Sequence, residues 1–283
     1  MPGSLLAISD LHVAYVDNRE LVEGIYPPSE QDWLIVAGDV GETHAETEWA
    51  LRLLSDRFAQ VIWVPGDHEL WSTRGACGSG GKARYLSLVA VCRRLGVLTP
   101  EDPYAVWMGP DGPVTVAPLF LLEEDNTLGT SEAEHAGFVE AACAEAVHCR
   151  DACAVGATPH PDECGCYAAW RTARVEEAER RLNACDPALP TVLISHFPLM
   201  RSLTGNLLHP ESAPQQGTER TSDWHLRFRA VAVVHGHLHM PYTAWQDGVR
   251  FEEVSVGYPR EWRRRGNSST VLRTILPHAG APR

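Results

Sequence analysis

Aspartate and histidine residues recur in short motifs, each of which follows a run of apolar residues. There are five such motifs, and they stand at Asp10-Leu11-His12, Gly38-Asp39, Asp67-His68-Glu69, His196 and His237-Leu238-His239. Carboxylate oxygens and imidazole nitrogens together form a ligand set for divalent metals such as Mn, Fe and Zn. Each motif alone is common in ordinary turns. Five of them at the ends of apolar runs favour a shared metal site.

Two motifs place metal-type side chains two residues apart: Asp10 with His12, and His237 with His239. In an extended chain, residues with this spacing point to the same side, so we expect each pair to reach one metal cluster. Asp39 follows Gly38, whose bare backbone permits close approach to an ion. One carboxylate can bridge two metals, and such pairs act on phosphoryl groups in hydrolases.

The elements that position these motifs are short buried strands. Apolar runs bounded by polar residues predict strands at residues 5–8, 33–37, 61–64, 192–194 and 231–234. Amphipathic patterns predict helices at residues 42–58, 83–95 and 170–182. Polar residues at the carboxyl ends of strands are typical of the binding sites of α/β folds. We therefore expect an α/β protein with its site at these strand ends.

An antiparallel region is expected near the end of the chain. Alternating patterns predict strands at residues 242–245, 249–256 and 269–276, and Asp247-Gly248 between the first two is a strong hairpin signal. The sequence therefore predicts two packed mixed sheets with flanking helices. We interpret residues 1–283 as one domain, with cap-like inserts at about 123–168 and 202–223 that are rich in loop-forming residues.

The charge balance limits the partners. The chain has 24 lysine and arginine residues against 37 aspartate and glutamate residues, a formal net charge of −13. An acidic protein is a poor ligand for long nucleic acids and for anionic membranes, although a local basic pocket is still allowed. The sequence contains no apolar segment of the roughly 18 residues that a membrane helix needs, and it starts without a signal peptide. We expect a cytoplasmic protein, and we make no prediction of its oligomeric state.

Four cysteines are close together within the first insert. They are Cys149, Cys153, Cys164 and Cys166. A structural zinc ion is one interpretation, because clustered thiolates bind zinc in many small sites. Their spacing differs from that of the common zinc ribbons, so free thiols or an adventitious disulfide are the alternatives.

The ordered set of motifs resembles that of the calcineurin-like metallophosphoesterases. That family combines Asp-x-His, Gly-Asp, Gly-Asn-His-Asp/Glu, a single His and Gly-His-x-His in this order. The corresponding residues here are Asp10 to His12, Gly38-Asp39, Gly66 to Glu69, His196 and Gly236 to His239. The resemblance covers about residues 4–275. It implies a four-layer α/β/β/α sandwich with a metal site at the carboxyl ends of its strands.

The resemblance also implies a role for each motif residue. Asp10, His12 and His239 would bind the first metal, and Asp39 would bridge the two metals. Asp67, His196 and His237 would bind the second. His68 would stabilise the transition state or protonate the leaving oxygen, and Glu69 would orient His68.

The function implied is hydrolysis of a phosphomonoester or phosphodiester of a small molecule. A metal-bound hydroxide would attack the phosphorus, because bound metals lower the pKa of water. The metals expected are Mn, Fe or Zn. Two other functions fit the same motifs: a metal-dependent enzyme that cleaves a non-phosphate bond such as an amide or C–N bond, and a non-catalytic binding module stabilised by metal.

One motif departs from the family pattern, because Asp67 stands where the family has asparagine. An aspartate adds a negative charge that the neutral amide oxygen of asparagine lacks. A trivalent ion in place of a divalent one would restore the balance, so Asp67 favours an Fe-containing pair. The alternatives are slower turnover with ordinary divalent ions, and an altered reaction.

Three residues outside the ligand set are candidate substrate contacts. Arg19 and Arg74 follow the motifs closely, and arginine suits a two-pronged grip on phosphate. A surface ion pair is the alternative for each. His235 precedes the last motif and is either a substrate or metal-supporting contact, or a neutral residue packed below the metals.

Overall fold

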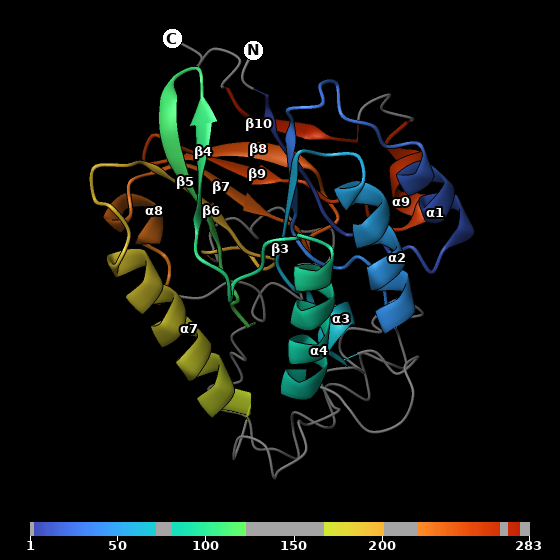
Figure 1. The fold of residues 1–283 in the computed structure, drawn as a ribbon, viewed down its shortest axis with the longest axis horizontal. Helices are drawn as coiled ribbons and strands as arrows, with labels where there is room; N and C mark the ends of the chain where they lie inside the picture. Colours follow the sequence, from blue (N-terminus) through green and yellow to red (C-terminus); the bar gives the residue numbers. More distant parts are fainter. Residues whose placement is uncertain (1–2, 72–80, 123–166, 201–219, 267–270, 278–283) are drawn as a thin grey trace.

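A computed structural model describes residues 3–71, 81–122, 167–200, 220–266 and 271–277 (Figure 1). Residues 123–166 and 201–219, which form most of the two expected inserts, lie outside the described residues. The four clustered cysteines and Arg74 therefore lie outside them as well. Residues 167 and 168 were expected in the first insert but belong to a helix.

The first sheet has four strands in the order β10-β1-β2-β3. Their bounds are Leu5–Ile8 for β1, Trp33–Val36 for β2, Gln60–Trp63 for β3 and Arg273–Leu276 for β10. β1, β2 and β3 are parallel, and β10 runs antiparallel to β1. The three parallel strands correspond to the first three predicted strands, so their carboxyl ends meet at one edge.

The second sheet has six strands in the order β4-β5-β6-β7-β9-β8. Their bounds are Ala105–Gly109 (β4), Gly112–Pro118 (β5), Thr191–Ile194 (β6), Ala230–His235 (β7), Tyr242–Gln246 (β8) and Val249–Glu253 (β9). The four central strands are parallel, whereas β4 and β8 are antiparallel edge strands. Both sheets are mixed, as predicted.

Helices cover the outer faces of both sheets (Figure 1). They are α1 (Val16–Glu23), α2 (His44–Ser55), α3 (Asp67–Trp71), α4 (Gly81–Arg94), α7 (Tyr167–Asn183), α8 (Trp224–Arg227) and α9 (Pro259–Arg264). α2 and α4 pack on the first sheet, and α7 and α8 pack on the second. The expected four-layer α/β/β/α arrangement is confirmed.

Alternating strand residues fill two different layers of the core. In β1, Leu5 and Ala7 face the second sheet, whereas Leu6 and Ile8 pack with the helices. Successive side chains of a strand point to opposite faces. Both faces of these sheets are covered, so the parallel strands are apolar at nearly every position. This explains why the strands read as continuous apolar runs.

The sequence patterns missed one hairpin. β4 and β5 pair in antiparallel register around a turn that contains Asp111 and Gly112. β4 is an edge strand of partly exposed residues, so it lacks the apolar run that marks the central strands. The Asp111-Gly112 pair was the local sequence signal for this hairpin. Helix α1 was missed for a similar reason, since only Asn18 and Val22 of its residues are buried.

The packing of α2 on the first sheet can be tested at adjacent positions. Leu51 is fully buried in the core between α2 and the sheet, whereas Arg52 is exposed. Leu51→Ala should lower the free energy of unfolding of the metal-free protein by about 2–5 kcal/mol, because it leaves a cavity. Arg52→Ala should change it by less than about 1 kcal/mol. Urea unfolding followed by circular dichroism would measure both, and equal effects would contradict this packing.

Candidate metal centre

The five motifs meet where the carboxyl ends of the two sheets adjoin. Asp10, Asp39 and Asp67 follow β1, β2 and β3, and His196 and His237 follow β6 and β7. Backbone hydrogen bonds join the loops: the N–H of Asp10 donates to Gly38 (2.9 Å), and that of Gly236 donates to His196 (3.0 Å). The predicted strand-end site is therefore one cluster of side chains.

One group of side chains forms around Asp10. Its Oδ1 lies 3.1 Å from His239 Nε2, which in turn lies 3.1 Å from His12 Nε2. These three residues offer ligand atoms that lie within 4.8 Å of one another. This group has the composition expected for the first metal.

A second group forms around Asp67. Its Oδ1 lies 3.1 Å from His196 Nε2 and 3.4 Å from His237 Nδ1. Asp39 lies between the two groups, because its carboxylate fits within 4.8 Å of ligand atoms in a set with Asp10 and His196. The structure thus brings together all seven side chains that were predicted as ligands.

The donor set fits metal ions. Asp10, Asp39 and Asp67 are buried, and their ion-pair partners among the described residues are all histidines. Buried carboxylates need positive charge nearby, which either protonated histidines or bound cations can supply. Two clusters of carboxylate and imidazole atoms can therefore accept divalent or trivalent cations.

Electrostatics distinguish the three carboxylates. Burial raises the pKa of Asp39, and the negative charge of Asp67 raises it further. Burial would also raise the pKa of Asp10 and Asp67, but hydrogen bonds and charge from the nearby histidines hold both well below the usual value. The charged form of Asp39 is therefore the least favourable of the three, and a shared cation would stabilise it most.

The backbone at this edge is not extended. Asp10, His12 and Asp39 have φ values of 54°, 42° and 53°, and His237 and His239 have values of 71° and 54°. The expectation that an extended chain aligns each Asp-x-His or His-x-His pair was therefore wrong. Five of the seven predicted ligands therefore have left-handed backbone, which residues other than glycine rarely adopt. Such strained conformations concentrate at functional sites.

Two glycines make room for the carboxylates. A Cβ atom at Gly66 would lie 2.0 Å from Asp39 Oδ1. A Cβ atom at Gly236 would lie 2.3 Å from Asp10 Oδ2. Any larger residue at either position would displace a ligand-type carboxylate, so the glycines of these motifs are required by close approach.

A comparison with known families agrees with this geometry. The model of the calcineurin-like phosphoesterase family matches residues 3–241, which includes every residue of the two clusters. The chain belongs to the calcineurin-like phosphoesterase family. The family implies divalent metal ions, and the chain is a metallophosphoesterase, as the motifs predicted.

The chain is also similar in sequence and structure to individual proteins. The chain is 48% identical over 275 residues to the [acyl-carrier-protein] phosphodiesterase PptH of Mycobacterium tuberculosis, covering 97% of this chain and 83% of that protein. The crystal structure of the phosphopantetheinyl hydrolase PptH from the same organism has a TM-score of 0.86, with 46% identity over 99% of this chain and 98% of that one. A Thermus thermophilus protein, TT1561, at 14% identity over 90% of each chain and a TM-score of 0.51, shares the fold.

The described hydrogen bonds of Glu69 are with backbone groups, whereas its predicted role was to orient His68. Its carboxylate accepts hydrogen bonds from the backbone N–H groups of Asp39 (3.0 Å), Val40 (2.5 Å) and Gly66 (2.8 Å). Both of its oxygens accept in this way, so Glu69 fixes the loops that carry the predicted ligands. Burial and the charge of Asp39 raise the pKa of Glu69 to about 7.

Glu42 is the carboxylate that faces His68, and sequence reasoning missed it. Its Oε1 lies 3.8 Å from His68 Nδ1, while His68 Nε2 lies 3.9 Å from both Asp39 Oδ2 and Asp67 Oδ2. His68 therefore has its Nε2 directed at the cluster and its Nδ1 directed at Glu42. The signal was the position of Glu42 just after the Gly38-Asp39 motif.

Two other carboxylates lie next to the predicted ligands: Glu261 contacts His239, and Glu253 acts on Asp10 through Ser255. Glu261 Oε2 lies 2.8 Å from His239 Nδ1, an arrangement that orients a metal-binding imidazole. Ser255 Oγ lies 2.7 Å from Asp10 Oδ2 and also contacts Glu253. One hydroxyl has one proton, so a neutral Glu253 lets Ser255 donate to Asp10. Burial and the charge of Asp10 raise the pKa of Glu253 to about 7, which favours that state.

The candidate substrate contacts have different outcomes. His235 is fully buried, lies 3.2 Å from the hydroxyl of Tyr242, and has its pKa lowered to about 4 by burial. These properties agree with the second interpretation of His235, a neutral residue packed below the metals. Arg19 lies 4.0 Å from Glu23 and stacks on Trp49, so its described contacts are those of a surface side chain. Arg74 lies outside the described residues.

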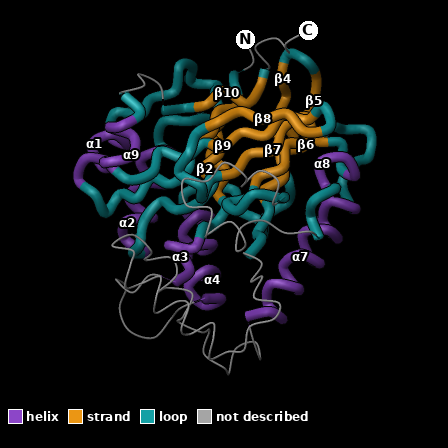
Figure 2. The backbone as a smooth tube through the Cα atoms, turned by 180° about the vertical axis from the view of Figure 1, so that it is seen from behind, coloured by secondary structure: helices purple, strands orange, loops and turns teal. Residues whose placement is uncertain are grey.

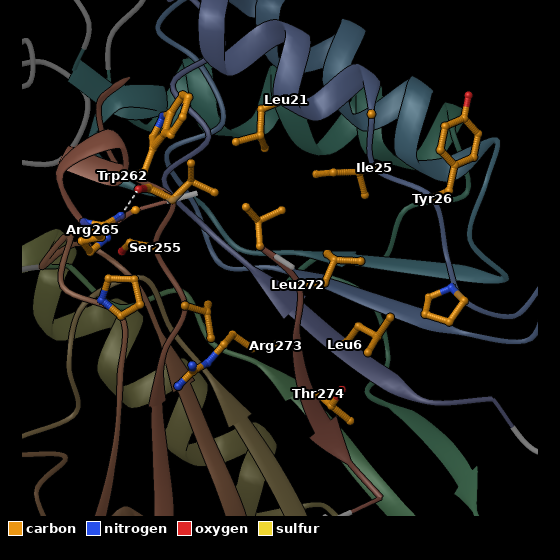
Figure 3. A pocket seen from close by; sticks show the side chains of 17 residues that line it. Leu6, Leu21, Ile25, Tyr26, Ser255, Trp262, Arg265, Leu272, Arg273 and Thr274 are labelled. Carbon is orange, nitrogen blue, oxygen red and sulfur yellow. Dashed lines mark hydrogen bonds between the residues drawn. The ribbon is translucent and has the colours of Figure 1, made fainter. Parts of the chain in front are cut away.

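A separate cavity of about 700 Å³ lies between α1, α9 and the β10 edge of the first sheet (Figure 3). Leu21, Ile25, Trp262 and Leu272 line it. None of the seven predicted metal ligands lines this cavity, but two of its lining residues contact them: Ser255 contacts Asp10, and Arg265 donates to the backbone carbonyl of His239 at 2.8 Å. The phosphoesterase site is therefore identified by its chemistry, and not by the size of this cavity.

The close approach at Gly66 gives a test of the metal site. Gly66→Ala should displace Asp39 and reduce the metal content of the purified protein, because the new methyl group occupies the place of a carboxylate oxygen. Gly24→Ala is a matched control, since its Cβ atom would lie 3.4 Å from the nearest atom, in ordinary contact. Metal analysis and circular dichroism would compare both variants. A full metal complement in a folded Gly66→Ala protein would contradict the proposed crowding.

Proposed function

We propose that this chain hydrolyses the phosphodiester that joins a phosphopantetheinyl group to an acyl carrier protein. The observation that supports this most is the 48% identity to the [acyl-carrier-protein] phosphodiesterase PptH, which extends over 97% of this chain. The proposal changes the expected substrate from a free small molecule to a small group attached to a protein. It also selects a diester over a monoester.

We propose that two metal ions are held by the clustered side chains. Asp10, His12 and His239 would hold one, and Asp67, His196 and His237 the other, with Asp39 between them; the fit of the buried carboxylates and imidazoles supports this. Bound metals would lower the pKa of water and neutralise charge on the phosphate.

Among the described residues, no helix is long and apolar enough to span a membrane.

The proposed work of the chain's own residues centres on His68. Its Nε2, on the cluster side of the ring, would give a proton to the oxygen that leaves phosphorus. Glu42, 3.8 Å from Nδ1, would keep the ring oriented. Glu69 would act indirectly by holding the loops of Asp39 and Gly66 in register.

The proposed roles of His68 and Glu42 predict a graded loss of activity. With phosphopantetheinylated acyl carrier protein as substrate, His68→Asn should lower kcat by about 10²–10⁴-fold, because a general acid contributes that much. Glu42→Gln should lower kcat less, since it removes only the orienting charge. Both variants should keep the metals of the wild type. Mass spectrometry of the carrier protein would follow loss of the group, and a fully active His68→Asn protein would refute this role.

We further propose that the metal pair contains iron, on the strength of Asp67. Its carboxylate is buried beside two imidazoles, so its negative charge is part of the cluster. The wild type should contain trivalent iron beside a divalent ion, and Asp67→Asn should lower the proportion of trivalent iron relative to divalent metals. Elemental analysis and electron paramagnetic resonance would measure this. Two divalent ions alone in fully active enzyme would rule it out.

A further inference from the structure

The surface beside the first candidate metal group is built by two helices. α9 starts after Tyr258, whose ring stacks on His12 with centroids 4.5 Å apart. Glu261, within α9, contacts His239. α1 starts four positions after His12 and lies beside α9 in both views (Figures 1 and 2). Anything that docks on these two helices is therefore next to the metal cluster.

The α9 side of this surface is basic, unlike the chain as a whole, whereas the exposed Glu20 and Glu23 of α1 are acidic. Arg260, Arg263 and Arg264 are exposed within the six residues of α9. Arg263 pairs with Asp17 of α1 at 2.7 Å, and Arg264 forms no ion pair with any residue that the structure describes. A local group of arginines on a protein with a net charge of −13 attracts an acidic partner to one place and one orientation.

An apolar patch adjoins the arginines. Val16 is 72% exposed at the start of α1, and Tyr15 is 37% exposed with its ring edge on Tyr258, 5.5 Å between centroids. Exposed aromatic and arginine side chains are enriched where proteins dock. A nucleic acid would need a longer basic track than one six-residue helix offers.

We propose that this α1–α9 surface (Tyr15, Val16, Arg260, Arg263 and Arg264) docks the acidic face of the carrier protein that presents the phosphopantetheinyl group. The inference rests on the proposed function. The bond to be cleaved joins the group to the carrier, so the carrier itself has to come within reach of the metal cluster. A basic surface attached to His12 and His239 through Tyr258 and Glu261 meets that requirement.

Charge reversal tests the proposal with two substrates. Arg263→Glu and Arg264→Glu should each raise KM for an acidic phosphopantetheinylated carrier protein by about tenfold, because they replace attraction with repulsion. Both variants should hydrolyse the small diester bis(4-nitrophenyl) phosphate within about twofold of the wild type. Higher salt should raise the wild-type KM for the carrier, and raise it less for the variants.

A matched control lies on the opposite side of the molecule. Arg180 of α7 is an exposed helical arginine that pairs with one acid, Glu177, at 2.6 Å, as Arg263 pairs with Asp17. α7 lies on the other side of the sheets from α1 and α9 (Figure 2). Arg180→Glu should leave KM for the carrier unchanged.

The outcomes separate the docking surface from the proposed function. If the wild type cleaves the carrier linkage and the reversals at Arg263 and Arg264 behave like Arg180→Glu, the docking surface is wrong and the function stands. If the wild type cleaves only the small diester, the proposed function is wrong and the carrier interface with it. If a short DNA duplex inhibits the wild type but not Arg264→Glu, the arginines bind nucleic acid, which also overturns the proposal.

Discussion

The burial of three aspartate carboxylates at one edge of the fold is the constraint on which the rest of the site depends. Asp10, Asp39 and Asp67 lie close together, and their ion-pair partners among the described residues are histidines. Like charges in a poorly solvated place are costly unless cations balance them. The surrounding groups serve this arrangement: Gly66 and Gly236 make room for the carboxylates of Asp39 and Asp10, and Glu261 contacts the imidazole of His239.

Local strain maintains this arrangement. Five ligand-type residues have left-handed backbone, which costs free energy at residues other than glycine. The hydrogen bonds of Glu69 to the backbone of Asp39 and Gly66 offset part of that cost, and they tie the loop after β2 to the loop after β3. A buried carboxylate that accepts several N–H groups is therefore a structural part of the site, even without contact to a substrate.

The sequence predicted the strands and the ligand-type residues because both signals are local. An apolar run followed by an aspartate or histidine needs no knowledge of distant contacts. The pairing of carboxylates with imidazoles was not predictable in this way: Glu69 is next to His68 in the chain, yet Glu42 faces the ring. The α/β/β/α layers followed from the family resemblance, whereas the β4–β5 hairpin was missed because an edge strand carries a weak apolar signal. Glu261, more than twenty positions from His239, had no local signal at all.

The candidate ligands are distributed from Asp10 to His239, and they come from loops of both sheets. A parallel bridge between Ser9 and Ser255 joins the sheets at the same place. Metal ions bound there would cross-link the first and last thirds of the chain. Such a cross-link would stabilise the folded state because it removes the entropy cost of closing a long loop. Because ligands that bind only the folded state add to its stability by mass action, metal supply would then set the lifetime of the protein as well as its chemistry. A shortage of metal would therefore lower the stability of the folded chain as well as its activity.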